Sequence, residues 1–180
     1  MRIFILNMLV LFTFISCKEK PQTRPIDVPT GGEVEKAILK VNKYILKRNR
    51  DHIQGFIRRT GWEMNKTGSG LWYQIDDHGK GNSAESGDYI RMKYKLFLID
   101  GTLVSSTESD GLLEFTIGQG GVESGLEEAV LFLKEGSMAK LILPPHLAYG
   151  NFGSPEKGIP PDAILLYKLE VLEIQAGSLY

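Results

Sequence analysis

The chain has 180 residues, a formal net charge of −1, an apolar content of 42% and a charged content of 24%, which is typical of one globular domain with modest extensions. The nearly balanced charge creates no global field that would recruit nucleic acid, so we expect no nucleic-acid partner. The three histidines and the single cysteine are scattered without ligand spacing, and no phosphate-binding glycine pattern is complete, so we expect neither a metal nor another cofactor.

The N-terminal segment has the pattern of an export signal. A positive charge at Arg2 precedes Ile3–Ile15, an almost continuous apolar run that is too short to predict a membrane-spanning helix. Phe14–Cys17 is similar to the lipobox of bacterial lipoproteins, which implies removal of residues 1–16 and lipidation of Cys17. An uncleaved N-terminal anchor is the alternative, and it would also tether the protein to a membrane.

A tether and a helix are predicted next. Residues 17–32 are rich in proline and glycine and cannot bury enough apolar surface to order themselves. Residues 33–60 have a helical pattern, because apolar residues recur at spacings of four and three, at Val34, Ile38, Val41 and Ile45. Lysines and arginines lie between them, and three interpretations stay open: a helix packed on its own domain, a partner or homodimer helix, and a membrane-surface helix.

The remaining residues, 61–176, are predicted to form an α+β domain. Gly61 ends the first helix, and Ile90–Leu98 alternates apolar and basic residues as a half-buried antiparallel strand does. Further strands are predicted at Leu112–Ile117, Met138–Leu143 and Ala163–Ile174. Between the first two of these three strands, Ser124–Glu135 has helical spacing, with Ser124 and Glu127 in a capping-box pattern and Gly136 placed to end the helix. This order predicts one helix laid across an antiparallel sheet.

A long loop joins the last two strands. Residues 144–161 contain five prolines and three glycines, which exclude regular structure, yet they also contain Leu147, Tyr149, Phe152 and Ile159. A long loop with large apolar side chains is typical of a functional segment. A surface connection whose aromatic residues pin it to the core is the alternative.

Short motifs from about Gly70 to Ile174 resemble FKBP-type peptidyl-prolyl isomerases in sequence and in order. They are Asp100-Gly101, Ser105-Ser106, Ile117-Gly118, Gly125–Ala129, Glu135-Gly136, Leu147–Gly150 and Gly158–Ala163. Leu147–Gly150 followed by Gly158–Pro161 at this distance is a specific signal. The resemblance implies a twisted antiparallel sheet wrapped over one short helix and, as the activity, rotation of prolyl peptide bonds.

Prolyl rotation requires the loss of amide resonance, with a barrier of ~18–20 kcal/mol, but makes and breaks no bond. The site therefore needs a dry aromatic cup and donors that hold the carbonyls of the twisted amide. The resemblance implies that Tyr149 donates its hydroxyl and Glu123 its backbone N–H. It also places a group of residues on the pocket wall, each of which could equally be plain core packing: Tyr94, Val104, Leu113, Phe115, Val122, Leu126, Ile159 and Tyr167.

Several positions depart from the family pattern. Ser105 stands where active members usually carry an aspartate, and Val104 and Leu113 replace pocket phenylalanines. Glu123 replaces an aliphatic residue and makes the rim more polar. We therefore expect an isomerase of reduced efficiency.

Two functions are consistent with these residues. The first is an isomerase that acts on proline-containing peptides or unfolded proteins of the cell envelope, anchored through Cys17 to the inner or outer membrane and facing the periplasm. The second is a catalytically weak chaperone or binding module within an envelope complex. The leader and composition also resemble envelope isomerase lipoproteins of Bacteroidetes, including those associated with gliding motility.

Overall fold

The structure is a computed structural model that describes residues 31–177, and the chain divides into two units, Met1–Ile38 and Leu39–Tyr180. The predicted leader (residues 1–16), Cys17 and nearly all of the predicted tether lie outside the described residues. Helix α1 (Gly31–Thr60) begins in the first unit and continues into the second. Within residues 31–177, no helix is long and apolar enough to cross a membrane.

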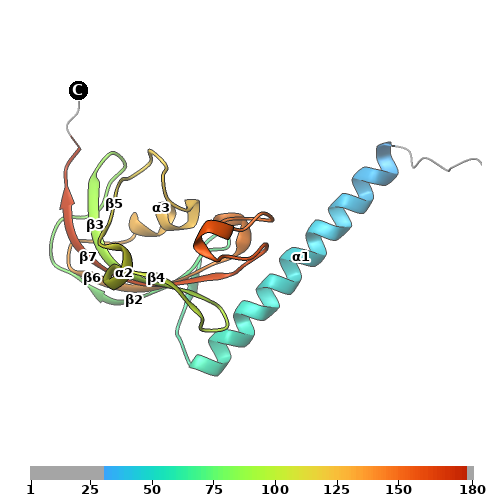
Figure 1. Cartoon of the computed structure of the whole chain (residues 1–180), viewed down its shortest axis with the longest axis horizontal. Helices are drawn as coiled ribbons and strands as arrows, with labels where there is room; N and C mark the ends of the chain where they lie inside the picture. The colour runs from blue at the N-terminus through green and yellow to red at the C-terminus, as the bar shows by residue number, and fades with distance from the viewer. Residues whose placement is uncertain (1–30, 178–180) are drawn as a thin grey trace, which may run out of the picture. The chain divides into compact units, whose positions relative to one another are not determined.

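A single antiparallel sheet organises the second unit (Figure 1). Its strands are β1 (Asn65–Lys66), β2 (Trp72–His78), β3 (Tyr89–Leu98), β4 (Leu103–Ser106), β5 (Leu113–Thr116), β6 (Ser137–Leu143) and β7 (Leu165–Gln175). The strand order is β1-β2-β6-β7-β3-β4, and β5 also pairs with β3. The predicted strands are confirmed to within a few residues at each end. Apolar and polar residues alternate along most of β3, whereas Leu141–Leu143 of β6 and Leu165–Tyr167 of β7 are buried on both faces of the sheet.

The main core lies between the sheet and α3 (Ser124–Val130), which Figure 1 shows on one side of the strands. Leu126, Ala129 and Val130 of α3 are almost completely buried against the sheet residues Leu141 and Tyr167. Close packing is possible here because Gly125 has no side chain, and a Cβ atom added to it would lie 2.8 Å from Leu143 Cγ. The short helix expected beneath the sheet is therefore present.

Helix α3 is shorter than predicted. The spacing of apolar residues predicts a helix from Ser124 to Glu135, which is wrong, because after Val130 the chain turns and Leu133 donates its N–H to the carbonyl of Val130. The predicted capping box is also wrong, since Glu123 is the N-cap and makes no side-chain cap. Glu127 instead accepts the N–H groups of Gly118 and Gly120 and fixes the loop before the helix.

The last turns of α1 cover the opposite face of the sheet. Ile53 is buried at 1% exposure against Ile142 and Ile164, and Phe56 packs edge-on against Trp62 with ring centroids 5.3 Å apart. Along β6, Leu141 and Leu143 face the main core, and Ile142 between them faces the other side of the sheet. The burial of Ile142 therefore depends on the last turns of α1. The interpretation of α1 as a helix packed on its own domain thus holds for its C-terminal half, whereas Val41 is 55% exposed.

The loop of residues 144–161 is anchored at both ends. It contains two single 3-10 turns, η1 (Pro145–Leu147) and η2 (Pro155–Lys157). Leu147 and Ile159 are buried in the core, but Phe152 is 87% exposed. The loop is thus pinned by aliphatic residues rather than by Phe152, and Tyr149 stands between the anchors.

Candidate active site

A cavity of about 520 Å³ opens where β3, β4, β7, the segment before α3 and the loop of residues 144–161 meet. Eight residues predicted for the site line it: Tyr94, Val104, Ser105, Leu113, Val122, Glu123, Tyr149 and Tyr167. Alternation along β3 and β7 explains why Tyr94 and Tyr167 point to the same side, with ring centroids 6.2 Å apart. The structure therefore brings together residues that lie up to 73 positions apart in the chain.

Three other predicted site residues lie deeper. Phe115, Leu126 and Ile159 are 8%, 0% and 2% exposed and belong to the core beneath the cavity, and they are not among the residues that line it. They support the cavity wall from behind. Any contact with a bound peptide at these positions stays a prediction.

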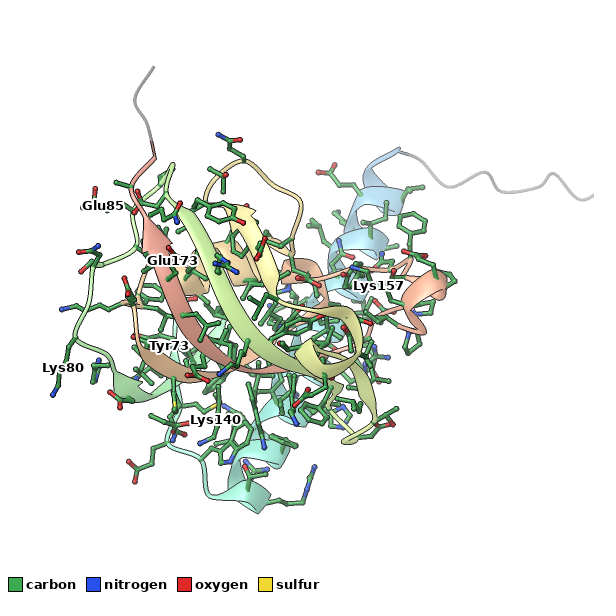
Figure 2. The ribbon with its side chains drawn as sticks, turned by 60° about the vertical axis from the view of Figure 1, so that its left-hand side comes forward. Tyr73, Lys80, Glu85, Lys140, Lys157 and Glu173 are labelled. Atoms are coloured by element: carbon green, nitrogen blue, oxygen red, sulfur yellow. The ribbon has the colours of Figure 1, made fainter. Side chains whose placement is uncertain are left out.

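Tyr149 is the best-placed donor of the site. Lys157 Nζ donates a hydrogen bond to its hydroxyl oxygen at 2.7 Å, so the hydroxyl keeps its own hydrogen to donate, and the Glu123 carboxylate is an acceptor close to it. Burial raises the pKa of Tyr149 well above its ordinary value, and the nearby Glu123 carboxylate raises it further. The hydroxyl therefore keeps its proton across the physiological pH range. Figure 2 labels Lys157 on the loop that carries η2, across the domain from Lys80.

Glu123 contributes a carboxylate and a backbone donor. The residue is 8% exposed and precedes the first turn of α3 with extended backbone angles. Among the described residues, no backbone carbonyl accepts its amide N–H, as expected for the first N–H groups at a helix start. Its charge lies near both Tyr149 and Tyr167, and burial together with that charge raises the pKa of Tyr167.

A chain of hydrogen bonds runs from Tyr94 through Ser105 to Asp110. The Ser105 hydroxyl donates to the Asp110 carboxylate, and Tyr94 Oη lies 2.5 Å from Ser105 Oγ. Because an ionised carboxylate can only accept and serine has one hydrogen, Tyr94 must be the donor to Ser105. Asp110 thus supplies, through Ser105, the negative partner that the sequence pattern lacks at position 105.

Sequence reasoning missed five cavity residues, of which Asp110, Glu156 and Lys157 are charged and Leu96 and Gly121 are not. Asp110 ends α2 (Thr107–Asp110), a helix of four residues that turns the chain back beside Ser105. The run Thr107–Asp110 directly after Ser105-Ser106 was the available signal, because short polar residues favour a tight turn. Glu156 and Lys157 come from η2, which no periodic pattern marks.

The fold and the site can be compared with known proteins. The family profile described as FKBP-type peptidyl-prolyl cis-trans isomerase matches residues 80–172, more than half of the chain. The chain belongs to this family. The recognition made from short motifs is therefore confirmed, as are the fold class and the family assignment as an isomerase.

Relatives of this FKBP-type chain include bacterial proteins named FkpA. The FKBP-type peptidyl-prolyl cis-trans isomerase FkpA of Escherichia coli K12 is 33% identical over 129 residues, which are 71% of this chain and 46% of that protein. FkpA of Buchnera aphidicola from Acyrthosiphon pisum is 30% identical over 162 residues, 84% of this chain and 64% of that protein. The chain thus spans about half to two thirds of the length of these relatives.

The crystal structure of FkpA from Escherichia coli superposes with a TM-score of 0.62 at 28% identity, covering 82% of this chain and 74% of that one. The similarity extends beyond the FKBP-type profile, which starts at residue 80. Among the described residues, no group of three or more His, Cys, Asp or Glu side chains could hold a metal ion. What the FKBP-type cavity offers a ligand is hydrogen-bond donors, aromatic rings and fixed charges.

Proposed function

We propose that the chain is a peptidyl-prolyl cis-trans isomerase that acts on proline-containing segments of unfolded or partly folded proteins. The observation that carries the proposal is the Tyr149 hydroxyl, which keeps its proton and is turned toward a cavity formed by the rings of Tyr94 and Tyr167. Membership of the FKBP-type family supports the same reaction.

In the proposed mechanism the cavity favours the twisted amide over the planar one. Tyr94 and Tyr167 remove water around the prolyl ring, which weakens the advantage that the strongly dipolar planar amide has in water. The Tyr149 hydroxyl and the Glu123 N–H then hold carbonyl groups that flank the rotating bond. Each tenfold of rate requires ~1.36 kcal/mol of stabilisation that is specific to the twisted form.

Cis/trans exchange of a short Leu-Pro peptide, measured by NMR with the purified full-length chain, tests the activity. We expect faster exchange with the wild type and an exchange rate reduced by about tenfold or more in Tyr149→Phe, which loses a hydrogen bond in the twisted state. Phe152→Leu is a matched control, because Phe152 lies on the same loop and its side chain is exposed. Equal rates in Tyr149→Phe and the wild type would remove Tyr149 from the mechanism.

A second function is favoured by the wall of the cavity. Val104 and Leu113 line the cavity where the family pattern has phenylalanines, and Glu123 puts a charge where that pattern has an aliphatic residue, so peptide binding without efficient rotation is the alternative. In this alternative the chain is an FKBP-fold chaperone or a module of an envelope complex. Suppression of aggregation that survives in Tyr149→Phe, in a chain with no measurable exchange activity, would support it.

We further propose that the protein works in the cell envelope, lipid-anchored to the inner or outer membrane through Cys17 and facing the periplasm. The support is the pattern of the first 17 residues. Two or more acyl chains hold a protein stably, since each buried methylene contributes ~0.8 kcal/mol. Radiolabelled fatty acid should label the wild type and not Cys17→Ser; equal labelling would contradict the anchor.

A homodimer through α1 is a related proposal. Its support is the row of exposed apolar residues on the first half of the helix, where Val34, Ile38 and Val41 are 41%, 54% and 55% exposed. Their spacing places them along one side of the helix, as a helix partner requires. Sedimentation equilibrium should give a dimer for the wild type and a monomer for Ile38→Glu/Val41→Glu; a monomeric wild type would refute the proposal.

A further inference from the structure

A second recess lies between α1, the hairpin of β1 and β2, and the start of the long loop. Its volume is about 820 Å³, which exceeds that of the catalytic cavity. We call it the basic groove. It is lined by Lys40, Lys43, Tyr44, Leu46, Lys47, Asn49 and Arg50 of α1, by Lys66, Gly68, Ser69, Gly70 and Trp72 of the hairpin, and by Pro144 and His146.

The basic groove has a strong charge asymmetry. Four lysines and one arginine line it, and none of its described lining residues is acidic, although the whole chain has a net charge of −1. Lys40, Lys43 and Lys47 form no ion pair with any described residue. Two carboxylates lie beside the groove: Asp51 pairs with Arg50 at 3.7 Å, and Glu128 accepts the Ser69 hydroxyl at 2.7 Å. The three lysines without a carboxylate partner repel one another, and an anionic ligand would relieve that repulsion.

The groove also offers apolar surface. Tyr44 and Leu46 are 66% and 54% exposed, and Lys66 Nζ lies over the Trp72 ring, 5.6 Å from its centroid. His146 Nε2 lies 2.8 Å from the Ser69 carbonyl oxygen and closes the floor. A ligand that fits must therefore combine negative charges with large apolar groups over several residues.

We propose that the basic groove binds acidic, partly apolar segments of the polypeptides on which the isomerase acts. A polypeptide can enter a concave recess, whereas a bilayer is nearly flat on this scale and meets convex surfaces. The two recesses carry opposite charge, since the catalytic cavity contains three acidic residues, Asp110, Glu123 and Glu156, and only one basic residue, Lys157. A segment that the catalytic cavity repels is thus attracted by the groove.

The position of the groove connects it with catalysis. His146 lines the groove, and the loop that carries His146 also carries Tyr149 and Lys157 of the catalytic cavity. A polypeptide bound at the groove would present its neighbouring prolines to the cavity at a raised effective concentration. This consequence rests on the proposed isomerase function, whereas the groove's affinity for an acidic peptide does not.

Binding to the full-length chain is tested with a fluorescein-labelled, proline-free peptide of alternating glutamate and leucine. The matched peptide has lysine in place of glutamate. The groove variant is Lys43→Glu/Lys47→Glu, and the charge-matched control is Lys36→Glu/Lys80→Glu, whose positions lie outside the groove. We expect the glutamate peptide to bind the wild type and the control equally, and the groove variant about tenfold more weakly, with affinity falling as salt rises.

Three results would overturn the proposal: no binding of the glutamate peptide, equal weakening by the control variant, or equal binding of the lysine peptide. Binding of phosphatidylglycerol vesicles through Lys43 and Lys47 without binding of the peptide would also overturn it, in favour of a membrane surface. The rate of cis/trans exchange of the short Leu-Pro peptide should be the same in the groove variant as in the wild type. A peptide that joins Leu-Pro to a glutamate-rich segment should show a KM raised about fivefold by the variant at constant kcat.

Discussion

The hydrogen-bond chain from Tyr94 through Ser105 to Asp110 can be tested by removing its end. In Asp110→Ala the Ser105 hydroxyl loses its acceptor and can turn to donate to Tyr94. Tyr94 is then no longer held as the donor to Ser105, and its hydroxyl loses its fixed orientation. Because Asp110 is exposed at the edge of the cavity, we expect the urea midpoint to stay nearly unchanged. We expect kcat/KM for exchange of a prolyl peptide to fall.

The magnitude follows from the geometry. A hydrogen bond to a charged group contributes about 1.5–3 kcal/mol when it is well shielded from water. Ser105 is half-buried and Asp110 is exposed, so screening reduces the effect to ~1 kcal/mol, which corresponds to about fivefold in kcat/KM. Ser105→Ala removes the same chain, so the double variant should lose no more than either single variant.

Exchange of a Leu-Pro peptide, followed by NMR, measures the effect, and Ser105→Asp supplies the decisive control. An aspartate at position 105 can accept the Tyr94 hydroxyl directly, as the family pattern implies. The double variant Ser105→Asp/Asp110→Ala restores one charge-assisted hydrogen bond to Tyr94. Its kcat/KM should therefore lie within about twofold of the wild-type value. An unchanged kcat/KM in Asp110→Ala, or a rescue variant no better than Asp110→Ala, would refute the role of Asp110.

Three further predictions concern the same site. Lys157→Met should lower kcat about threefold at nearly constant KM, because the Tyr149 hydroxyl becomes a weaker donor; a rise in KM alone would contradict this. Leu126→Ala should lower the free energy of unfolding by about 2–5 kcal/mol in urea melts, whereas Leu113→Ala at the cavity wall should cost under about 1.5 kcal/mol and mainly raise KM. Since burial raises the pKa of Tyr149 in the folded state, the unfolded chain releases this proton first, and stability should fall as pH rises above about 10. Urea midpoints between pH 9 and 11 should fall less steeply for Tyr149→Phe than for the wild type, and equal slopes would contradict the raised pKa.

Strands and their buried faces could be predicted where apolar and polar residues alternate, as along β3 and in Tyr167–Val171 of β7. Alternation placed Tyr94 and Tyr167 each on one face of its own strand, and the family resemblance placed both in one pocket. The end of α3 could not be predicted in this way. Leu133 keeps the helical spacing but is buried by a turn in which Lys134 bridges to Ser83, a contact distant in sequence.

The polar part of the site was the least predictable. Asp110 reaches Ser105 through a helix of four residues, too short to show any periodicity. Lys157 reaches Tyr149 across a loop whose path depends on the burial of Leu147 and Ile159. Along α1, one apolar pattern runs from buried Ile53 to exposed Val41, because burial there depends on whether the sheet lies alongside. The periodicity of apolar residues carries no signal for such contacts.

The position of β7 in the sheet also affects how the chain folds during synthesis. β7 lies between β6 and β3, and its register with β3 runs from Tyr89 opposite Gln175 to Leu98 opposite Leu165. During synthesis β3 and β6 emerge from the ribosome well before the strand that joins them, and such long-range pairing is intrinsically slow. The centre of the sheet thus stays open until residue 175 has emerged. Until then β3 and β6 have no strand between them with which to pair.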